Sequence, residues 1–185
     1  MKKNFGKKTY LYPMPVFIVA TYDKENKANA MVAAWGGIYD TNKVFVCVDP
    51  SHQTAKNLVE KKAFTLSMAD AAHVAECDYL GIESGKNEEN KLEKCGFTVT
   101  KAEFVDAPVI NELAMCIECS VLSYDITTGC MVAEIENVSA DEEVLTDGKI
   151  DVTKLGVITY DSVNHNYIKL GEIVGKAFSD GNKIK

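Results

Sequence analysis

The chain has 185 residues, with a hydrophobic fraction of 46% and a charged fraction of 25%, values typical of a folded globular protein with one large core. Its basic residues are all lysines, and the excess of acidic residues gives a formal net charge of −7. This negative field repels phosphodiester backbones and anionic lipid heads, so neither nucleic acid nor a membrane is expected as a partner.

The sequence lacks the apolar segment of a secretory signal and any uninterrupted apolar run long enough to span a bilayer. We therefore expect a cytoplasmic protein whose cysteines are thiols, because that compartment reduces disulfides. The six cysteines are Cys47, Cys77, Cys95, Cys116, Cys119 and Cys130. One domain over 1–185 is expected, with residues 1–9 and 182–185 as tails.

The first half of the chain alternates strand and helix signals. Residues 16–22 and 28–35 are rich in β-branched or small apolar residues and flank a polar turn, which predicts a β-hairpin. Residues 44–48 and 64–68 are predicted strands. Between them, residues 51–62 place apolar side chains at helical spacing, and Ser51 or Thr54 could cap the helix.

Helical and irregular structure is expected over residues 71–96, where glycines interrupt the pattern. Strand signals then dominate at 114–125, 130–138 and 156–160. Many strands with few helices favour a mostly β protein, a barrel or sandwich with helical insertions, over a doubly wound parallel sheet.

The stretch ANAMVAAWGG, residues 28–37, is unusual because a strand of small residues carries one carboxamide, Asn29, and stops at the chain's single tryptophan, Trp35. Small side chains are required where a strand packs closely inside a sheet. They are equally required where a flat ligand lies against the strand backbone. The sequence leaves both interpretations open.

Two further segments are candidates for binding an anion. The predicted helix N-terminus at Ser51, His52 and Thr54 would offer unpaired N–H groups, hydroxyls and an imidazole to a phosphate, although such residues also begin ordinary helices. Ser84 and Gly85 would allow close backbone approach and Lys86 would add a positive charge, although this segment also suits a surface turn.

Other chemistries find no support in the sequence. Cys116 and Cys119 have the spacing of a redox or metal motif, but an offset of three along a strand directs them to opposite faces, so buried thiols are favoured. The histidines, glycines and serines do not form a metal site, a nucleophile elbow or a known nucleotide-binding loop. We expect no metal, and the catalytic residues are not identified.

Taken together, the segments resemble the flavin reductase-like family with the FMN-binding split β-barrel, and most nearly its flavoredoxin branch. The resemblance spans about residues 10–181. It rests on Pro15-Val16, Asn29 to Trp35, Ser51 to Thr54, Ser84-Gly85-Lys86 with Lys91, Asp106-Ala107-Pro108, and Leu170-Gly171-Glu172 with Gly175.

The resemblance implies a homodimer that binds FMN near the subunit interface, with Trp35 packed in the core or at that interface. It implies flavin contacts from the thin strand, a phosphate site at the helix N-terminus and a loop near the ring. These residues are Asn29, Ala30, Met31, Val32 and Ala33; Ser51, His52 and Thr54; and Ser84, Gly85 and Lys86. Relatives commonly carry arginine at the positions of His52 and Lys86, and arginine grips phosphate more strongly than either replacement.

The function implied by the resemblance is an FMN-binding oxidoreductase that uses its flavin to take up and pass on electrons, with NAD(P)H as a candidate donor. One alternative is a flavoredoxin-like electron carrier between protein partners, without NAD(P)H turnover. Another is a flavin-binding module without catalysis.

Overall fold

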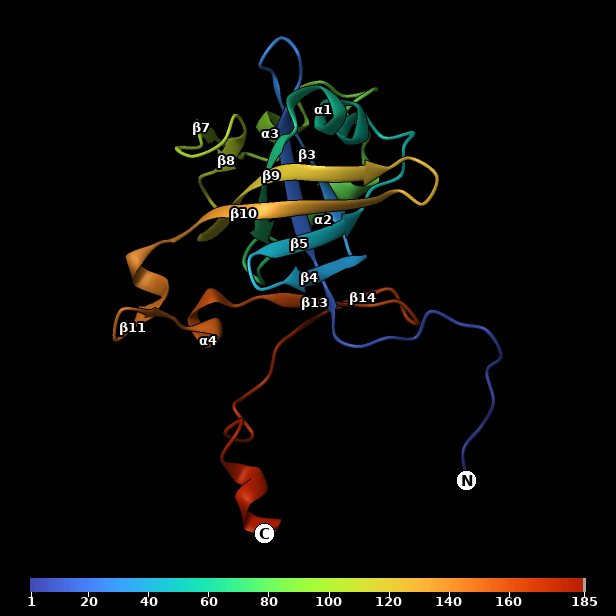
Figure 1. Cartoon of the computed structure of the whole chain (residues 1–185), viewed down its shortest axis with the longest axis vertical. Coiled ribbons are helices and arrows are strands. Elements are labelled where there is room, and N and C mark those ends of the chain that lie inside the picture. Colours follow the sequence, from blue (N-terminus) through green and yellow to red (C-terminus); the bar gives the residue numbers. More distant parts are fainter. Residues whose placement is uncertain (185) are drawn as a thin grey trace.

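A seven-stranded antiparallel sheet forms the centre of the molecule in the computed structural model, which describes residues 1–184 (Figure 1). Its strands follow the order β3-β2-β6-β9-β10-β5-β4. They are β2 (Phe17–Tyr22), β3 (Ala28–Ala33), β4 (Gly36–Asp40), β5 (Lys43–Cys47), β6 (Ala63–Met68), β9 (Met115–Asp125) and β10 (Cys130–Ala140).

The sheet is curled into a split barrel because strands that are consecutive in the chain, β3 and β4, occupy its two opposite ends. The short turn at Ala34 and Trp35 connects them, and the backbone N–H of Cys47 donates to the carbonyl of Trp35 at 2.7 Å. The predicted mostly β architecture with helical insertions is confirmed. β3 is an end strand, so the backbone groups along its outer edge have no strand partner.

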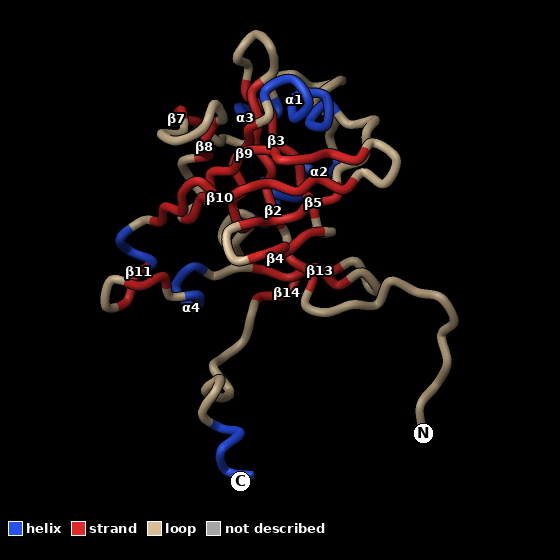
Figure 2. Tube along the Cα trace, viewed as in Figure 1, coloured by secondary structure: helices blue, strands red, loops and turns tan. Residues whose placement is uncertain are grey.

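The remaining elements cover the sheet and extend from its base (Figure 2). The helices are α1 (Gln53–Lys61), α2 (Val74–Ile82), α3 (Lys91–Lys94) and α4 (Val152–Leu155), with 3₁₀ turns at Glu142–Val144 and Asp180–Ile184. Smaller sheets join β1 (Met14–Pro15) to β13 (Ile158–Asp161) and β14 (Asn166–Lys169), β7 (Val99–Lys101) to β8 (Pro108–Ile110), and β11 (Leu145–Thr146) to β12 (Lys149–Ile150). No helix of residues 1–184 is long and apolar enough to cross a membrane.

The continuous apolar run of β2 follows from burial on both faces of the sheet. Phe17 and Val19 join one core cluster, inside the barrel and beneath α1. Ile18 and Ala20 join a second cluster on the opposite face, with the buried side chains of α2 and α3. Alternate side chains of β2 therefore pack into two different core clusters.

The predicted hairpin, the strands near 44–48 and 64–68 and the three later strands are confirmed, with ends shifted by a few residues. β4 was not predicted, since Gly36 and Gly37 suggest a break. A β-carbon at Gly36 would lie 2.8 Å from the carbonyl oxygen of Phe45, so this strand requires glycine for close packing. The short strands β7 and β8 were also missed.

The helix near 51–62 is confirmed, but neither predicted cap is present. His52 is the N-cap residue, and its side chain makes no capping hydrogen bond. The Asp49 side chain instead accepts the backbone N–H of Ser51 at 2.8 Å, in the turn that precedes α1. The N-terminus of α1 therefore keeps free N–H groups for another partner.

Candidate functional site

Three adjoining cavities run along β3 toward the N-terminus of α1. The large cavity has a volume of about 550 Å³, the middle cavity about 200 Å³ and the outer cavity about 290 Å³. Met31, Val32 and His52 line both the large and the middle cavity, while Asn29, Gln53 and Gly85 line both the middle and the outer cavity. The total is sufficient for an extended ligand of cofactor size.

The side chains of β3 contribute both to the cores and to the walls of these cavities. Met31, Val32 and Ala33 line the large cavity, and Asn29 lines the middle one. Ala30 is fully buried among the apolar residues of the second core cluster and does not line any of the three cavities, so only its backbone could contribute to binding. Within this strand the Ala30 side chain packs in the core, while neighbouring residues on both faces of the strand line the cavities.

The middle cavity has the features of an anion site at the N-terminus of α1. The backbone N–H groups of Gln53, Thr54 and Ala55 have no hydrogen-bond partner within residues 1–184. The Thr54 side chain is 2% exposed, and its hydroxyl accepts a hydrogen bond from the Asn29 amide at 3.0 Å, which leaves the hydroxyl proton free to donate. Together with the partial positive charge of the helix end, these donors suit a phosphate.

Among residues 1–184, Lys91 is the one cation that lines the middle cavity, and it is only 3% exposed. Its ammonium donates to the carbonyl oxygens of Leu80 and Glu83 at 3.2 and 3.0 Å, at the C-terminal end of α2. An ammonium has three protons, so one remains for a ligand. Burial lowers the pKa of Lys91 to about 8, against the smaller opposing effects of Cys95 and Glu83.

The loop after α2 closes the middle cavity. Gly85 lies against Asn29, and a β-carbon at Gly85 would be 2.3 Å from the Asn29 side-chain oxygen. Ser84 lines the middle cavity, whereas Lys86 lines only the outer one. Glu83 also lines the middle cavity, and its carboxylate accepts the backbone N–H of Ser84 at 3.0 Å.

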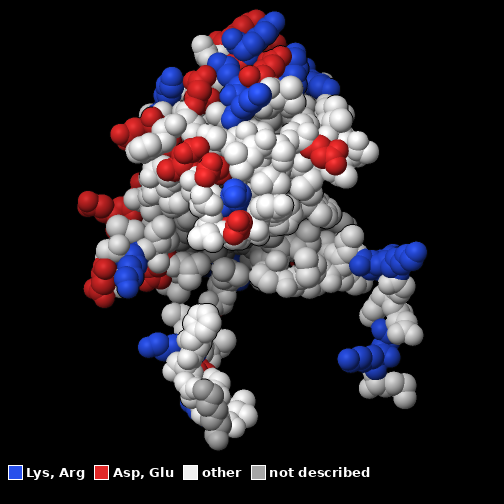
Figure 3. All heavy atoms as spheres, in the orientation of Figure 1, with Lys and Arg blue, Asp and Glu red and all other residues white. Residues whose placement is uncertain are grey.

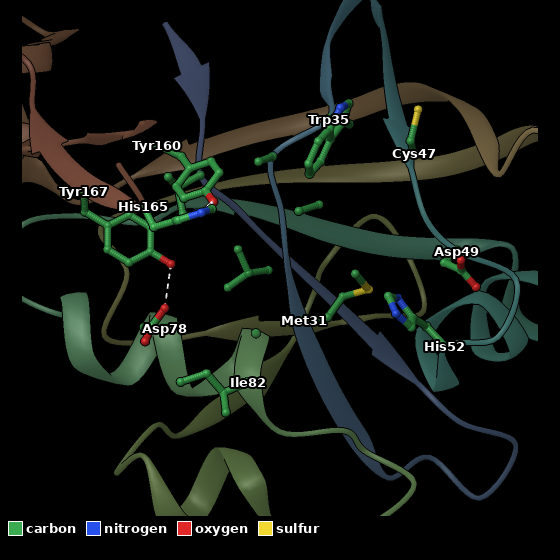
Figure 4. A pocket seen from close by; sticks show the side chains of 15 residues that line it. Met31, Trp35, Cys47, Asp49, His52, Asp78, Ile82, Tyr160, His165 and Tyr167 are labelled. Carbon is green, nitrogen blue, oxygen red and sulfur yellow. Dashed lines mark hydrogen bonds between the residues drawn. The ribbon is translucent and has the colours of Figure 1, made fainter. Parts of the chain in front are cut away.

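A polar cluster from three elements occupies the end of the large cavity opposite His52 (Figure 4). The Tyr167 hydroxyl of β14 donates to the Asp78 carboxylate of α2 at 2.7 Å. The Tyr160 hydroxyl of β13 lies 2.7 Å from Nδ1 of His165 in the following turn. Burial, and then the hydrogen bond to Asp78, raise the pKa of Tyr167, so its hydroxyl stays protonated.

Trp35 is 53% exposed and lines the large cavity, so it does not pack in the core of the single chain, and its packing at a subunit interface stays a prediction. It lies in the turn between β3 and β4, where the chain passes from one end of the sheet to the other. Its side chain therefore lies at the cavity wall rather than in the barrel interior.

Nine of the eleven predicted site residues line the three cavities. The exceptions are Ala30, whose side chain is in the core, and Ser51, which is exposed in the turn before α1 and contacts none of the three cavities. The sequence did not identify Lys91 as a site residue, nor the polar cluster of Asp78, Tyr160, His165 and Tyr167. Lys91 was visible only as part of a family resemblance, and the other four come from separate elements.

No group of three or more His, Cys, Asp or Glu side chains in residues 1–184 is placed to hold a metal ion. Cys116 and Cys119 are buried free thiols, as predicted. Burial raises the pKa of Cys116 to about 11 and that of Cys119 to about 12.

A split barrel with an anion site and a cofactor-sized cavity along its end strand defines a class of flavin-binding proteins. The family model of the flavin reductase like domain matches residues 9–156. The chain belongs to this flavin reductase-like family, which confirms the resemblance and supports flavin binding and oxidoreductase chemistry.

The solved structures that resemble the chain include two flavoredoxins. Flavoredoxin of Desulfovibrio vulgaris (Miyazaki F) is 38% identical, with a TM-score of 0.94 over 98% of this chain and 100% of that one. Flavoredoxin from Methanosarcina acetivorans is 26% identical, with a TM-score of 0.91 over the whole of both chains. The chain is therefore nearest the flavoredoxin branch.

More distant structures share the fold. The FMN-binding domain of a flavin reductases-like enzyme from Shewanella baltica is 19% identical, with a TM-score of 0.79 over 88% of each chain. No curated protein sequence matches the chain significantly.

Proposed function

We propose that the chain binds FMN, with the phosphate at the N-terminus of α1 and the ring system in the large cavity, and uses it as an oxidoreductase that takes up and passes on electrons. The observation that carries this proposal is the anion site of the middle cavity, built from α1, Thr54 and Lys91, which adjoins the large cavity. One phosphate site suits a mononucleotide more simply than a dinucleotide. The FMN-binding neighbour from Shewanella baltica supports the same choice.

The backbone and side chains along β3 suit this cofactor. The outer edge of β3 offers unpaired backbone groups to the edge of a ring, and the apolar side chains of Met31 and Val32 keep water from its face. When bound, FMN supplies the electron-transfer chemistry. The chain contributes binding, orientation and exclusion of water, so a catalytic dyad is not required.

The polar cluster lies at the end of the large cavity opposite His52, where it could bind a second reactant. We propose that Tyr167, held by Asp78, and Tyr160, held by His165, orient the polar group of a second reactant beside the flavin. The single proton of the Tyr167 hydroxyl is donated to Asp78, so the phenol oxygen remains as an acceptor for an N–H or O–H group of the reactant. Such a site is compatible with the carboxamide of NAD(P)H and with an electron-accepting small molecule.

Similarity to two flavoredoxins supports a second candidate, an electron carrier between protein partners. A carrier would exchange electrons with a redox protein and would not oxidise NADH or NADPH. The two candidates share the FMN site and differ only in the electron donor.

An anaerobic absorbance experiment tests the proposal. We expect the protein, purified with or loaded with FMN, to show flavin absorbance bands. Prompt bleaching by NADH or NADPH would support the oxidoreductase with a nicotinamide donor. Bands that bleach only with a redox protein or dithionite would support the carrier. A colourless protein that does not bind added FMN would overturn both.

We also propose that the chain forms a homodimer. The chain after β14 extends away from the sheet as an arm, residues 171–184, whose apolar side chains Ile173, Val174 and Phe178 are almost fully exposed (Figure 1). The central surface over β9, β10, β5 and β4 carries few charges (Figure 3). Exposed apolar segments of this extent mark protein interfaces, and a second copy offers both surfaces at once.

Ending the chain at Leu170 is therefore expected to weaken dimerisation at least tenfold, because the apolar arm is lost. Light scattering during size-exclusion chromatography over a range of protein concentrations would measure this. A control chain with Lys176→Ala and Lys183→Ala changes the same arm without removing its apolar surface, and should remain dimeric. A full chain that is monomeric at high concentration would contradict the proposal.

A further inference from the structure

Two of the six cysteines face each other across neighbouring strands. Cys47 is the last residue of β5 and Cys130 is the first residue of β10, and the two are directly opposite in the antiparallel register. Both are free thiols. Their position in the ladder decides how close the thiols are.

The backbone hydrogen bonds show that Cys47 and Cys130 form a non-hydrogen-bonded pair of the antiparallel ladder. The N–H of Cys47 points away from β10 and donates to the carbonyl of Trp35 at 2.7 Å, whereas the next residue, Val48, donates to the carbonyl of Gly129 at 2.8 Å. At such a non-hydrogen-bonded pair the Cα atoms are about 4.5 Å apart and the side chains are at their closest. A disulfide requires a Cα separation of about 4.4 to 6.8 Å, so this pair can be bridged without backbone movement.

Both thiols are accessible to small molecules. Cys47 and Cys130 are each partly exposed, and Cys47 lines both the large cavity and a neighbouring one of about 290 Å³ bounded by Thr127 and Thr128. The other strand cysteines have different neighbours. Cys116 lies opposite Ser67 and Ser139, and Cys119 lies opposite Phe64 and Ile135.

We infer that Cys47 and Cys130 form a redox-active dithiol that reduces small disulfides, such as oxidised glutathione, by closing into a cross-strand disulfide. The thiolate of one cysteine attacks a sulfur of the small disulfide, and a mixed disulfide forms as the first small thiolate leaves. The thiolate of the other cysteine then attacks the protein sulfur, expels the second small thiolate and closes the Cys47–Cys130 bond. Two electrons pass to the small disulfide, and the two protons of the protein thiols balance the two released thiolates.

Two properties of the pair affect this reaction: the pKa of Cys47 and the partial exposure of both cysteines. Burial, and then the adjacent Cys130 thiol, raise the pKa of Cys47, so little thiolate is present at neutral pH. The pair is partly exposed, which is a feature of readily reduced, labile disulfides. The bond should therefore form and break reversibly, in contrast to a structural disulfide.

The test uses the full chain, reduced, freed of reductant and incubated with oxidised glutathione at pH 8.5. After denaturation and alkylation with N-ethylmaleimide, intact mass should show four alkylated thiols instead of all six, and peptide mapping should identify a Cys47–Cys130 bond. The initial rate should rise with pH from 7 to 8.5, since the thiolate reacts. This readout does not depend on flavin, so it is independent of the proposed function.

Variants separate the two chemical steps. Cys130→Ser should stop at a glutathione adduct on Cys47, and Cys47→Ser should stop at an adduct on Cys130. Cys95→Ser is the matched control, because Cys95 is also a partly exposed thiol and should leave the cross-strand bond unaffected. Six alkylated thiols in the parent chain, or a bond between Cys77 and Cys95, would overturn the inference, and peptide mapping of the parent gives this answer without any variant.

Discussion

Thr54→Ala is expected to raise the dissociation constant for FMN about 10- to 150-fold. The Thr54 hydroxyl accepts from Asn29 at 3.0 Å and can direct its own proton to a phosphate at the N-terminus of α1. A hydrogen bond to a charged group contributes about 1.5–3 kcal/mol, and about 1.4 kcal/mol corresponds to a tenfold change in affinity. Quenching of flavin fluorescence during titration measures the dissociation constant.

The matched control is Thr54→Ser, which keeps the hydroxyl and should bind FMN nearly as well as the parent. Because the alanine variant also loses the bond to Asn29, its unfolding free energy without flavin should fall by about 1 kcal/mol. That measurement separates a change in the protein from a lost contact to the ligand. An unchanged dissociation constant in Thr54→Ala would remove Thr54 from the site.

Lys91→Met is expected to weaken FMN binding by about 10- to 100-fold at pH 7, because it removes the buried ammonium of the middle cavity and a charge-assisted hydrogen bond. Methionine retains a similar length of apolar side chain. Isothermal titration calorimetry at several pH values would test both the affinity and its pH dependence.

The lowered pKa of Lys91, about 8, determines the sign of that dependence. Below pH 8 the side chain is charged and attracts the phosphate, and above pH 8 it becomes neutral. A phosphate monoester has its second pKa near 6, so the charge of the ligand hardly changes in this range. FMN affinity should therefore fall from pH 7 to 9.5 in the parent and stay nearly constant in Lys91→Met. Parallel curves would show that Lys91 does not contact the phosphate.

The same residue should affect the stability of the flavin-free protein. Because the folded state lowers the Lys91 pKa from 10.5, the unfolded chain binds more protons between pH 8 and 10.5. The free energy of unfolding of the parent, relative to Lys91→Met, should thus rise over this interval, by up to about 3 kcal/mol. A difference that is independent of pH would contradict burial of this charge.

Much of the fold was predictable because its strands carry local signals. The hairpin of β2 and β3 and the helix α1 follow from residue type and spacing within short windows. β4 was missed because its glycines have no local preference for a strand. They are needed only where β4 packs against β5 and Phe17, contacts that exist after the sheet has curled.

The residues of the candidate site also fall into those predictable from local sequence and those that depend on tertiary packing. Met31, Thr54 and Gly85 were predicted from their segments and do line connected cavities. Ser51 was not brought to the site, since the turn at Asp49 directs it to solvent. Lys91 could not be recognised as a buried cation from sequence alone, because its burial depends on α2 and α3 packing beside β3.

By itself, the sequence determined the class of fold and the family, because each depends on order and spacing along the chain. Only the tertiary structure decided which side chains meet. It brought Asp78 of α2 to Tyr167 of β14 and placed Cys47 opposite Cys130. It also buried the Ala30 side chain in the second core cluster, away from the cavities that its neighbours in β3 line. These contacts depend on the curl and register of the sheet, which long-range packing sets and no short segment encodes.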